Sequence, residues 1–362
     1  MEGDLIHINE WLRPLSWLYG CVVRCRNMLF EWGVLKQTSY DVPVICVGNI
    51  TVGGTGKTPH TELLLRMLLP QRRVAVLSRG YKRKSRGFRL ATANTPMTEV
   101  GDEPWQMKHK FTDAIVAVDA DRRHGINQLL TLDETCDVGV ILLDDAFQHR
   151  YVKAGLNILL TDYHRLITDD ELMPAGRLRE PVSAKDRANI VIVTKCPSAM
   201  KPMDYRVIQE ALNLKPYQSL FFSTFRYGAL RRLFSDTPGQ TEELTPDTHV
   251  LLLTGIASPQ QMLMDIRRIT RHITPMSFAD HHEFDARDVQ RIEEAFTAMQ
   301  GSKRFIITTE KDAARLLLVD DLSPIVRRHI YVMPIEVEFL RGEGTAFESE
   351  INDFVLHQQK LW

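Results

Sequence analysis

The sequence has 362 residues, enough for about two domains with a buried core. Lys and Arg number 45 against 46 Asp and Glu, so the formal net charge of −1 gives no support for a nucleic-acid partner. The five cysteines form no CxxC pair, which disfavours a structural zinc site or a disulfide framework.

The first predicted element is an amphipathic helix over residues 13–31, and we assign residues 1–36 to this segment. Polar or small residues recur every three or four positions, with aliphatic and Trp side chains around them. The longest run without charge, residues 14–23, is half of the ~20 residues that a spanning helix needs. Two interpretations stay open: a helix lying in a membrane interface, or a helix docked on the protein's own core.

Short apolar runs then alternate with helical stretches, which predicts a mostly parallel, doubly wound α/β sheet. The predicted strands are 44–47, 74–78, 115–118, 138–143, 157–161 and 190–194, and the predicted helices are 58–69, 121–130 and 203–212. After a looser stretch at 235–247, further strands are predicted at 250–255, 304–309 and 330–337. We therefore predict a larger domain over residues 37–225 and a smaller α/β domain over residues 226–362.

Residues 44–58 have the strand–loop–helix order of a phosphate-binding loop of the P-loop NTPase class. The nucleotide-binding residues predicted here are Gly53, Gly54, Thr55, Gly56, Lys57 and Thr58. Glycines let backbone N–H groups surround the phosphates of ATP, Lys57 would reach the β- and γ-phosphates, and Thr58 would offer its hydroxyl to Mg²⁺. The usual pattern has Gly at the position of Thr51, so an incidental Gly-rich turn is the alternative.

A second apolar strand ends in Asp144 and Asp145. Ligands bind at the carboxyl ends of strands in open α/β sheets, and acids there can hold Mg²⁺ directly or through water. Such a pair on its own is more often a turn or a helix cap. Together with the phosphate loop it predicts a metal site formed by Asp144, Asp145 and Thr58.

Two other classes of P-loop protein are disfavoured. Partition and division ATPases have a second lysine just before the Gly-Gly pair, where this sequence has Val52. GTPases need an [NT]-K-x-D segment to recognise guanine, and the nearest candidate has Pro197 in place of the aspartate.

Eight segments in order carry a more specific pattern. They are residues 14–20 (PLSWLYG), 47–59 (VGNITVGGTGKTP), 78–81 (SRGY), 101–104 (GDEP), 143–149 (LDDAFQH), 176–181 (GRLREP), 278–284 (FADHHEF) and 308–312 (TTEKD). The series resembles the tetraacyldisaccharide 4'-kinase (lipid A 4'-kinase) family and spans most of the chain.

The resemblance implies transfer of the ATP γ-phosphate to the 4'-hydroxyl of tetraacyldisaccharide 1-phosphate, giving lipid IV-A. It also implies a glycolipid substrate at the cytoplasmic face of a Gram-negative inner membrane. Two alternatives stay open: a P-loop kinase for another lipid or sugar, and a membrane-associated regulatory ATPase or metallochaperone.

The resemblance also assigns a catalytic pair. Asp102 is the family's candidate base and His281 its partner, a combination that could orient and tune the carboxylate. The residues alone leave alternatives, because Asp102 also fits a helix N-cap ahead of Pro104, and His282 lies beside His281.

Further contacts follow from other motif positions. The predicted residues are Arg79, Tyr81, Arg179 and Glu180 for the substrate, and Gln148 and His149 for the nucleotide site. Arg179 could neutralise charge on the transferred phosphoryl group, and a buried structural ion pair is the open alternative for Arg179 and Glu180.

Overall fold

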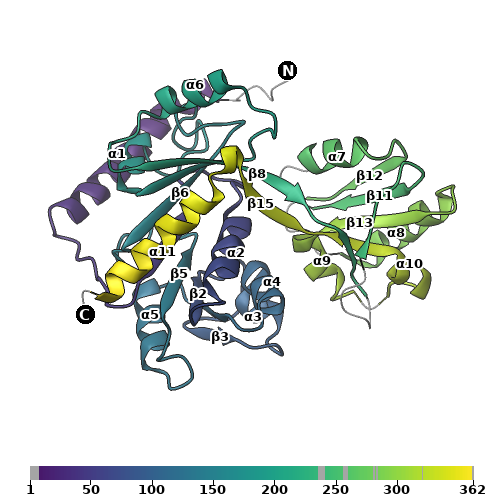
Figure 1. Ribbon diagram of the computed structural model, residues 1–362, viewed down its shortest axis with the longest axis horizontal. Coiled ribbons are helices and arrows are strands. Elements are labelled where there is room, and N and C mark those ends of the chain that lie inside the picture. The colour runs from purple at the N-terminus through teal and green to yellow at the C-terminus, as the bar shows by residue number, and fades with distance from the viewer. Residues whose placement is uncertain are drawn as a thin grey trace. The chain divides into compact units, whose positions relative to one another are not determined.

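The computed structural model describes residues 8–234, 241–255, 260–279, 282, 284–319 and 321–360. The chain forms two compact units, one of residues 1–225 with 337–362 and one of residues 226–336 (Figure 1). The chain passes from the first unit to the second within strand β8 (Ser219–Tyr227) and returns within β15 (Ile335–Phe339).

The first unit is built on a nine-stranded sheet in the order β15-β8-β7-β6-β1-β5-β2-β4-β3. Its other strands are β1 (Val44–Gly48), β2 (Val74–Ser78), β3 (Arg89–Ala91), β4 (Ile115–Val118), β5 (Val140–Asp144), β6 (Leu156–Asp162) and β7 (Ile190–Thr194). The pairings from β8 to β4 are all parallel, and β3 pairs with β4 in the antiparallel direction.

The helices of this unit lie on both faces of the sheet. They are η1 (Glu10–Leu12), α1 (Arg13–Glu31), α2 (Lys57–Leu68), α3 (Met97–Val100), α4 (Asp102–Lys110), α5 (Arg122–Thr131), η2 (Val182–Arg187), α6 (Pro202–Leu212), η3 (Leu340–Gly342) and α11 (Gly344–Lys360). The mostly parallel α/β fold predicted from the strand and helix periodicity is confirmed.

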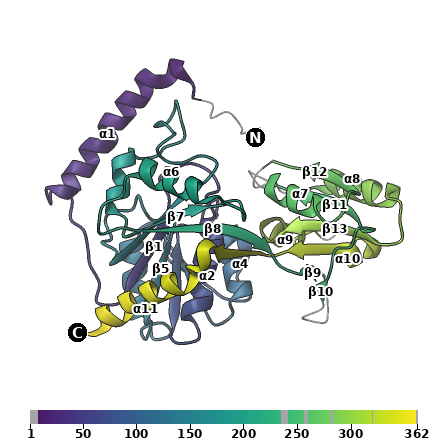
Figure 2. The same cartoon turned by 45° about the horizontal axis from the view of Figure 1, so that its top comes forward.

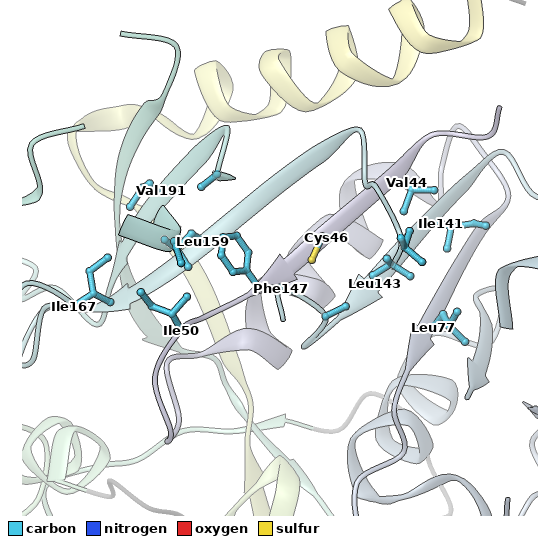
Figure 3. Close-up of a cluster of buried hydrophobic side chains, with 14 of the residues drawn as sticks. Val44, Cys46, Ile50, Leu77, Ile141, Leu143, Phe147, Leu159, Ile167 and Val191 are labelled. Carbon is cyan, nitrogen blue, oxygen red and sulfur yellow. The ribbon is translucent and has the colours of Figure 1, made fainter. Parts of the chain in front are cut away.

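Alternation along the strands divides the core into two layers. Val44 and Cys46 of β1 face a layer closed by α5 and α6, part of which is shown in Figure 3. Ile45 and Val47 face the opposite layer, which α2 and α11 cover. Each fully buried aliphatic side chain stabilises the fold by roughly 1.5–3 kcal/mol, so these two layers hold the sheet rigid beneath the loops at its edge.

Strand β1 lies between β5 and β6, so the strand order changes direction at this point. The loops that follow β1 and β5 leave the carboxyl edge of the sheet side by side, because Val47 is paired with Asp144. This crevice is where open α/β sheets bind ligands.

Helix α1 has the bounds predicted from the sequence, and it lies on the outside of the first unit (Figure 2). Most of its large apolar side chains are exposed. Ser16, Gly20 and Asn27 are buried, and a Cβ on Gly20 would lie 2.7 Å from the side chain of Leu172. The large exposed side chains of α1 are Leu15, Trp17, Leu18, Val22, Met28 and Leu29, and Trp11 and Trp32 are exposed beside its two ends. A helix docked by its apolar face would show the reverse pattern, so the structure argues against that alternative.

The second unit contains a six-stranded sheet in the order β10-β9-β14-β13-β11-β12. Its strands are β9 (Leu230–Arg232), β10 (Thr241–Glu242), β11 (His249–Thr254), β12 (Ile273–Ser277), β13 (Arg304–Thr309) and β14 (Ile330–Met333). Its helices are α7 (Gln260–Arg267), α8 (Ala286–Ala298), α9 (Glu310–Leu316) and α10 (Pro324–His329). Residues 308–312 form a strand-to-helix cap, in which the Thr309 hydroxyl accepts from the Asp312 backbone N–H at 3.1 Å.

The C-terminal residues correct the predicted domain assignment. We expect residues 226–362 to form the second domain, but residues 337–362 pack with the first unit. The predicted strand 330–337 is divided at Pro334, which has no N–H to continue a sheet ladder. Beyond it, β15 joins the edge of the first sheet. Phe347, Ile351 and Val355, spaced four apart on α11, enter the core of that sheet.

Candidate active site

The phosphate loop depends on two left-handed glycines. Gly53 has φ +120°, and Gly56, the N-cap of α2, has φ +85°. A Cβ on Gly56 would also lie 2.7 Å from the ring of Phe225, so a side chain there would be both strained and in steric conflict. The loop therefore delivers Lys57 as the first residue of α2, at the positive end of the helix dipole.

Thr51 explains why the loop does not need a glycine at its start. Thr51 forms an antiparallel bridge with Leu178, so this part of the loop is extended and tolerates a side chain. Asn49 organises the interior of the loop, because its side-chain N–H₂ donates to the hydroxyls of Thr51 at 3.3 Å and Thr55 at 2.7 Å. The departure at Thr51 is therefore compatible with a phosphate-binding loop.

Asp145 forms ion pairs with Lys57 of the phosphate loop and with Arg179 of a second loop. The Lys57 Nζ lies 3.7 Å from one carboxylate oxygen of Asp145, and Arg179 donates to the other at 3.0 Å. Burial by itself would raise the pKa of Asp145, but Lys57 and Arg179 outweigh it and hold that pKa below its ordinary value. Asp145 is therefore ionised, and it holds Lys57 near the loop.

Asp144 has the opposite electrostatic environment. It is fully buried, and burial, together with Glu103 and Asp145, raises the pKa of its carboxyl to about 7. Its oxygens accept hydrogen bonds from Thr61 at 3.2 Å and Ser78 at 3.5 Å. A buried carboxylate of this kind is stabilised by a bound cation.

A magnesium ion fits the donors at this position. Within the described ranges, no three His, Cys, Asp or Glu side chains are grouped as a metal cage. Mg²⁺ does not require one, because it usually binds one or two carboxylates and fills its remaining positions with phosphate oxygens and water. The predicted oxygen donors are Asp144 at the end of β5, Asp145 directly after it, and Thr58 on the first turn of α2.

Gln148 and His149 follow Asp145 on the same loop. The Gln148 side chain donates to the Asn49 carbonyl at 2.7 Å, which ties this loop to the phosphate loop. The His149 Nε2 lies 3.7 Å from the carboxylate of Asp121. Burial, followed by the charge of Arg122, lowers the pKa of His149 to about 4, so the ring is neutral at pH 7.

The Arg-Glu-Pro motif divides between the two interpretations given for it. Arg179 faces the site through its ion pair with Asp145. Glu180 is only 1% exposed and pairs with Arg187, which stacks over the ring of Phe147. The geometry therefore favours the buried structural ion pair for Glu180 and a site position for Arg179.

Asp102 is the first residue of α4, whose N-cap is Gly101, so Asp102 is not the helix cap. Its neighbour Glu103 is close enough to Asp144 to raise the pKa of that carboxyl, which directs the start of α4 toward the site. Arg79 and Tyr81 follow β2, at the same edge of the sheet, and both are exposed.

The predicted partner His281 lies outside the described residues. Its neighbour His282 is held by Asp288, with the ring Nε2 2.5 Å from a carboxylate oxygen. His282 thus has a local partner within its own unit.

Comparisons with known proteins agree with this geometry. The family model described as tetraacyldisaccharide-1-P 4'-kinase matches residues 8–355. The chain belongs to the tetraacyldisaccharide 4'-kinase family. It is 54% identical to the tetraacyldisaccharide 4'-kinase of Phocaeicola vulgatus, over 98% of this chain and 97% of the relative. It is 55% identical to the Bacteroides fragilis enzyme, over 98% and 95%.

A solved structure supports the fold. The crystal structure of LpxK from Aquifex aeolicus in complex with ATP is 27% identical with a TM-score of 0.72, and the match covers 96% of this chain and 99% of that one. The family predicted from the eight segments and the P-loop fold predicted from residues 44–58 and the alternating strands and helices are thereby confirmed.

For this family member, the structure adds a site residue that the sequence motifs did not indicate. Arg122 is buried, and it lies near Asp144 and Asp145, which act against the lowering of its pKa by burial. Its Nε has no hydrogen-bond partner among the described residues. In the sequence, Arg122 follows Asp121, a normal helix N-cap, so it looks like an ordinary first-turn residue. Its position at the site is therefore indicated by its burial in the structure and by no feature of the sequence.

Proposed function

We propose that this protein transfers the γ-phosphate of ATP to the 4'-hydroxyl of tetraacyldisaccharide 1-phosphate, forming lipid IV-A. The observation that carries the proposal is the pairing of Lys57 and Arg179 with Asp145 beside the phosphate loop. This arrangement supplies the cations and the carboxylate that phosphoryl transfer needs.

ATP would bind with its phosphates in the loop of residues 53–58. Backbone N–H groups of the loop and the start of α2 would surround the β-phosphate. Lys57 is already poised by Asp145, and a bound γ-phosphate would compete with that carboxylate for the ammonium. Gln148 and His149 shape the adjoining loop.

Mg²⁺ would be held by Asp144, Asp145 and the hydroxyl of Thr58. When bound, it would supply positive charge that offsets the negative charge of the ATP phosphates. Burial and nearby carboxylates raise the pKa of Asp144 to about 7, so near pH 7 a large share of this carboxyl is protonated without a cation, and a bound cation would favour the ionised form.

The acceptor hydroxyl needs a base and the transferred group needs neutralisation. Asp102, at the start of α4, is proposed to accept the hydroxyl proton, with His281 as its partner. Arg179 and Arg122 are proposed to stabilise negative charge on the transferred phosphoryl group. Arg79 and Tyr81 are proposed to bind the glycolipid substrate.

A membrane surface is the proposed location, at the cytoplasmic face of a Gram-negative inner membrane. Trp11 of η1 is 93% exposed and Trp17 of α1 is 69% exposed, whereas the buried residues of α1 are small or polar apart from Phe30. Trp and aliphatic side chains arranged in this way favour the interface of a bilayer. No helix in the described part of the chain is both long and apolar enough to cross a bilayer.

Acceptor dependence separates a kinase from the alternative of a regulatory ATPase or metallochaperone. We expect ATP turnover to rise in proportion to added tetraacyldisaccharide 1-phosphate and to stay near background without it. Turnover that is fast without acceptor and unchanged by it would contradict the kinase assignment.

A further inference from the structure

The inner face of α1 contacts two loops that carry site residues. The Tyr19 hydroxyl donates to the backbone carbonyl of Arg179 at 2.8 Å. The Arg26 guanidinium donates to the backbone carbonyl of Gln148 at 3.1 Å. The Ser16 hydroxyl accepts from the Ala175 N–H at 2.9 Å, so the loop of Arg179 is held at a second point, three residues before Tyr19 on the helix.

Each of these two loops is in turn hydrogen-bonded to the start of the phosphate loop. The Arg179 backbone N–H donates to the Ile50 carbonyl at 2.7 Å, and its guanidinium contacts Asn49 and Asp145. The Gln148 side chain donates to the Asn49 carbonyl at 2.7 Å. Asn49 then holds Thr55 of the phosphate loop. Two short chains of hydrogen bonds therefore run from α1 to the nucleotide site and meet at Asn49.

The two faces of α1 therefore make different contacts. The outer face presents Trp17, Leu18 and Val22 to the surroundings, and the inner face holds the loops of Arg179 and Gln148. In water the exposed apolar face favours any motion of α1 that buries it, and such a motion would release the inner contacts. On a lipid surface the outer face is buried against the acyl chains without any motion of α1, so the inner contacts are kept.

We propose that Tyr19 and Arg26 are positioning residues that couple the seating of α1 on a membrane to the ordering of the phosphate loop. The inference rests on the proposed function, because it assumes ATP in the loop and lipid against α1. It follows that the protein binds ATP more tightly on a membrane than in solution. Coupling between two sites is reciprocal, so ATP must strengthen membrane binding by the same factor.

The test measures the affinity for a non-hydrolysable ATP analogue with and without vesicles of phosphatidylethanolamine and phosphatidylglycerol. Flotation of the protein with the same vesicles is measured in parallel, with and without the analogue. For the wild type we expect about threefold to tenfold tighter nucleotide binding on vesicles, the range that one or two hydrogen bonds can transmit. We expect the same factor in vesicle binding when the analogue is added.

Tyr19→Phe removes only the hydroxyl and should reduce both effects, and combining it with Arg26→Met should abolish them, while the protein still floats with vesicles. Arg26→Met tests the second contact in the same way if Tyr19→Phe does not fold. Tyr217→Phe is the matched control, because its hydroxyl also donates to a backbone carbonyl, that of Asp186 at 2.7 Å, on η2. This control should keep the full vesicle effect.

The outcomes distinguish the coupling from the proposals beneath it. A wild type that floats but binds the analogue equally well with and without vesicles overturns the coupling and leaves membrane docking standing. A folded Tyr19→Phe protein with the full vesicle effect overturns the role of Tyr19. A wild type that does not float overturns the membrane proposal and the coupling together, and one that binds no nucleotide overturns the proposed function.

Discussion

Neutralising Asp144 should stabilise the metal-free protein while removing its activity. Asp144 is fully buried, and burial with Glu103 and Asp145 raises its pKa from 3.8 to about 7. The folded protein therefore binds a proton between these pH values that the unfolded chain does not, so stability falls as pH rises through this window. Asp144→Asn keeps the shape and the polar contacts to Thr61 and Ser78 without the charge.

The magnitude follows from the same two pKa values. Ionising Asp144 in the folded protein at pH 8 costs roughly 4 kcal/mol at most, and we expect about 2–4 kcal/mol to be recovered in Asp144→Asn. For a domain of this size 1 kcal/mol shifts Tm by about 2–4 °C, so the variant should melt about 4–16 °C higher. At pH 5 the folded wild-type carboxyl is protonated, but the unfolded chain still gains from ionising above 3.8, so the difference in stability should fall to about 1–2 kcal/mol.

The assay is thermal unfolding in a chelator, without nucleotide, at pH 8 and pH 5. Asp145→Asn is the matched control, because Lys57 and Arg179 outweigh its burial and hold the pKa of Asp145 low. That variant should be less stable than the wild type at both pH values. An Asp144→Asn protein that melts below the wild type at pH 8, as Asp145→Asn is expected to do, would refute the reasoning.

Two further predictions concern the acid–base groups. Asp102→Asn and His281→Ala should each lower kcat by ~10²–10⁴-fold with little change in ATP affinity, and the double variant should be little worse than the poorer single one. Multiplicative losses in steady-state kinetics would show that the two residues act independently. Burial lowers the pKa of His60 to about 4, so its contribution of roughly 3 kcal/mol is complete above pH 6.5 and is lost as pH falls toward 4. Urea titrations from pH 7 to pH 4 should show a shallower acid loss for His60→Gln, and identical profiles would contradict this assignment.

Much of the first sheet could be predicted because its strands are nearly uninterrupted apolar runs. Residues 74–78, 115–118 and 190–194 are the observed bounds of β2, β4 and β7. A parallel strand buried on both faces carries this signal in its own sequence. The phosphate loop and the pair Asp144–Asp145 could also be predicted from the sequence, since each lies directly after such a run.

The sequence could not predict which face of a helix, or which edge of a sheet, a segment packs against. The periodicity of residues 13–31 predicts a helix with two faces, but the pattern is the same whether the apolar face meets lipid or the core. Likewise, the sequence around Pro334 does not indicate that β15 returns to the first sheet, because the partners of an edge strand lie far away in the chain. Arg122 was missed for the same reason: its burial depends on loops after β2 and β5.

The central claim is tested most directly by incubating the protein with γ-labelled ATP, Mg²⁺ and tetraacyldisaccharide 1-phosphate and locating the label in the product. We expect one labelled phosphate per disaccharide at the 4'-position, and no labelled lipid from Lys57→Ala, which should fold normally because Lys57 acts on phosphate charge. Label that appears only as inorganic phosphate, or a folded Lys57→Ala protein that labels the lipid as well as the wild type does, would contradict the account.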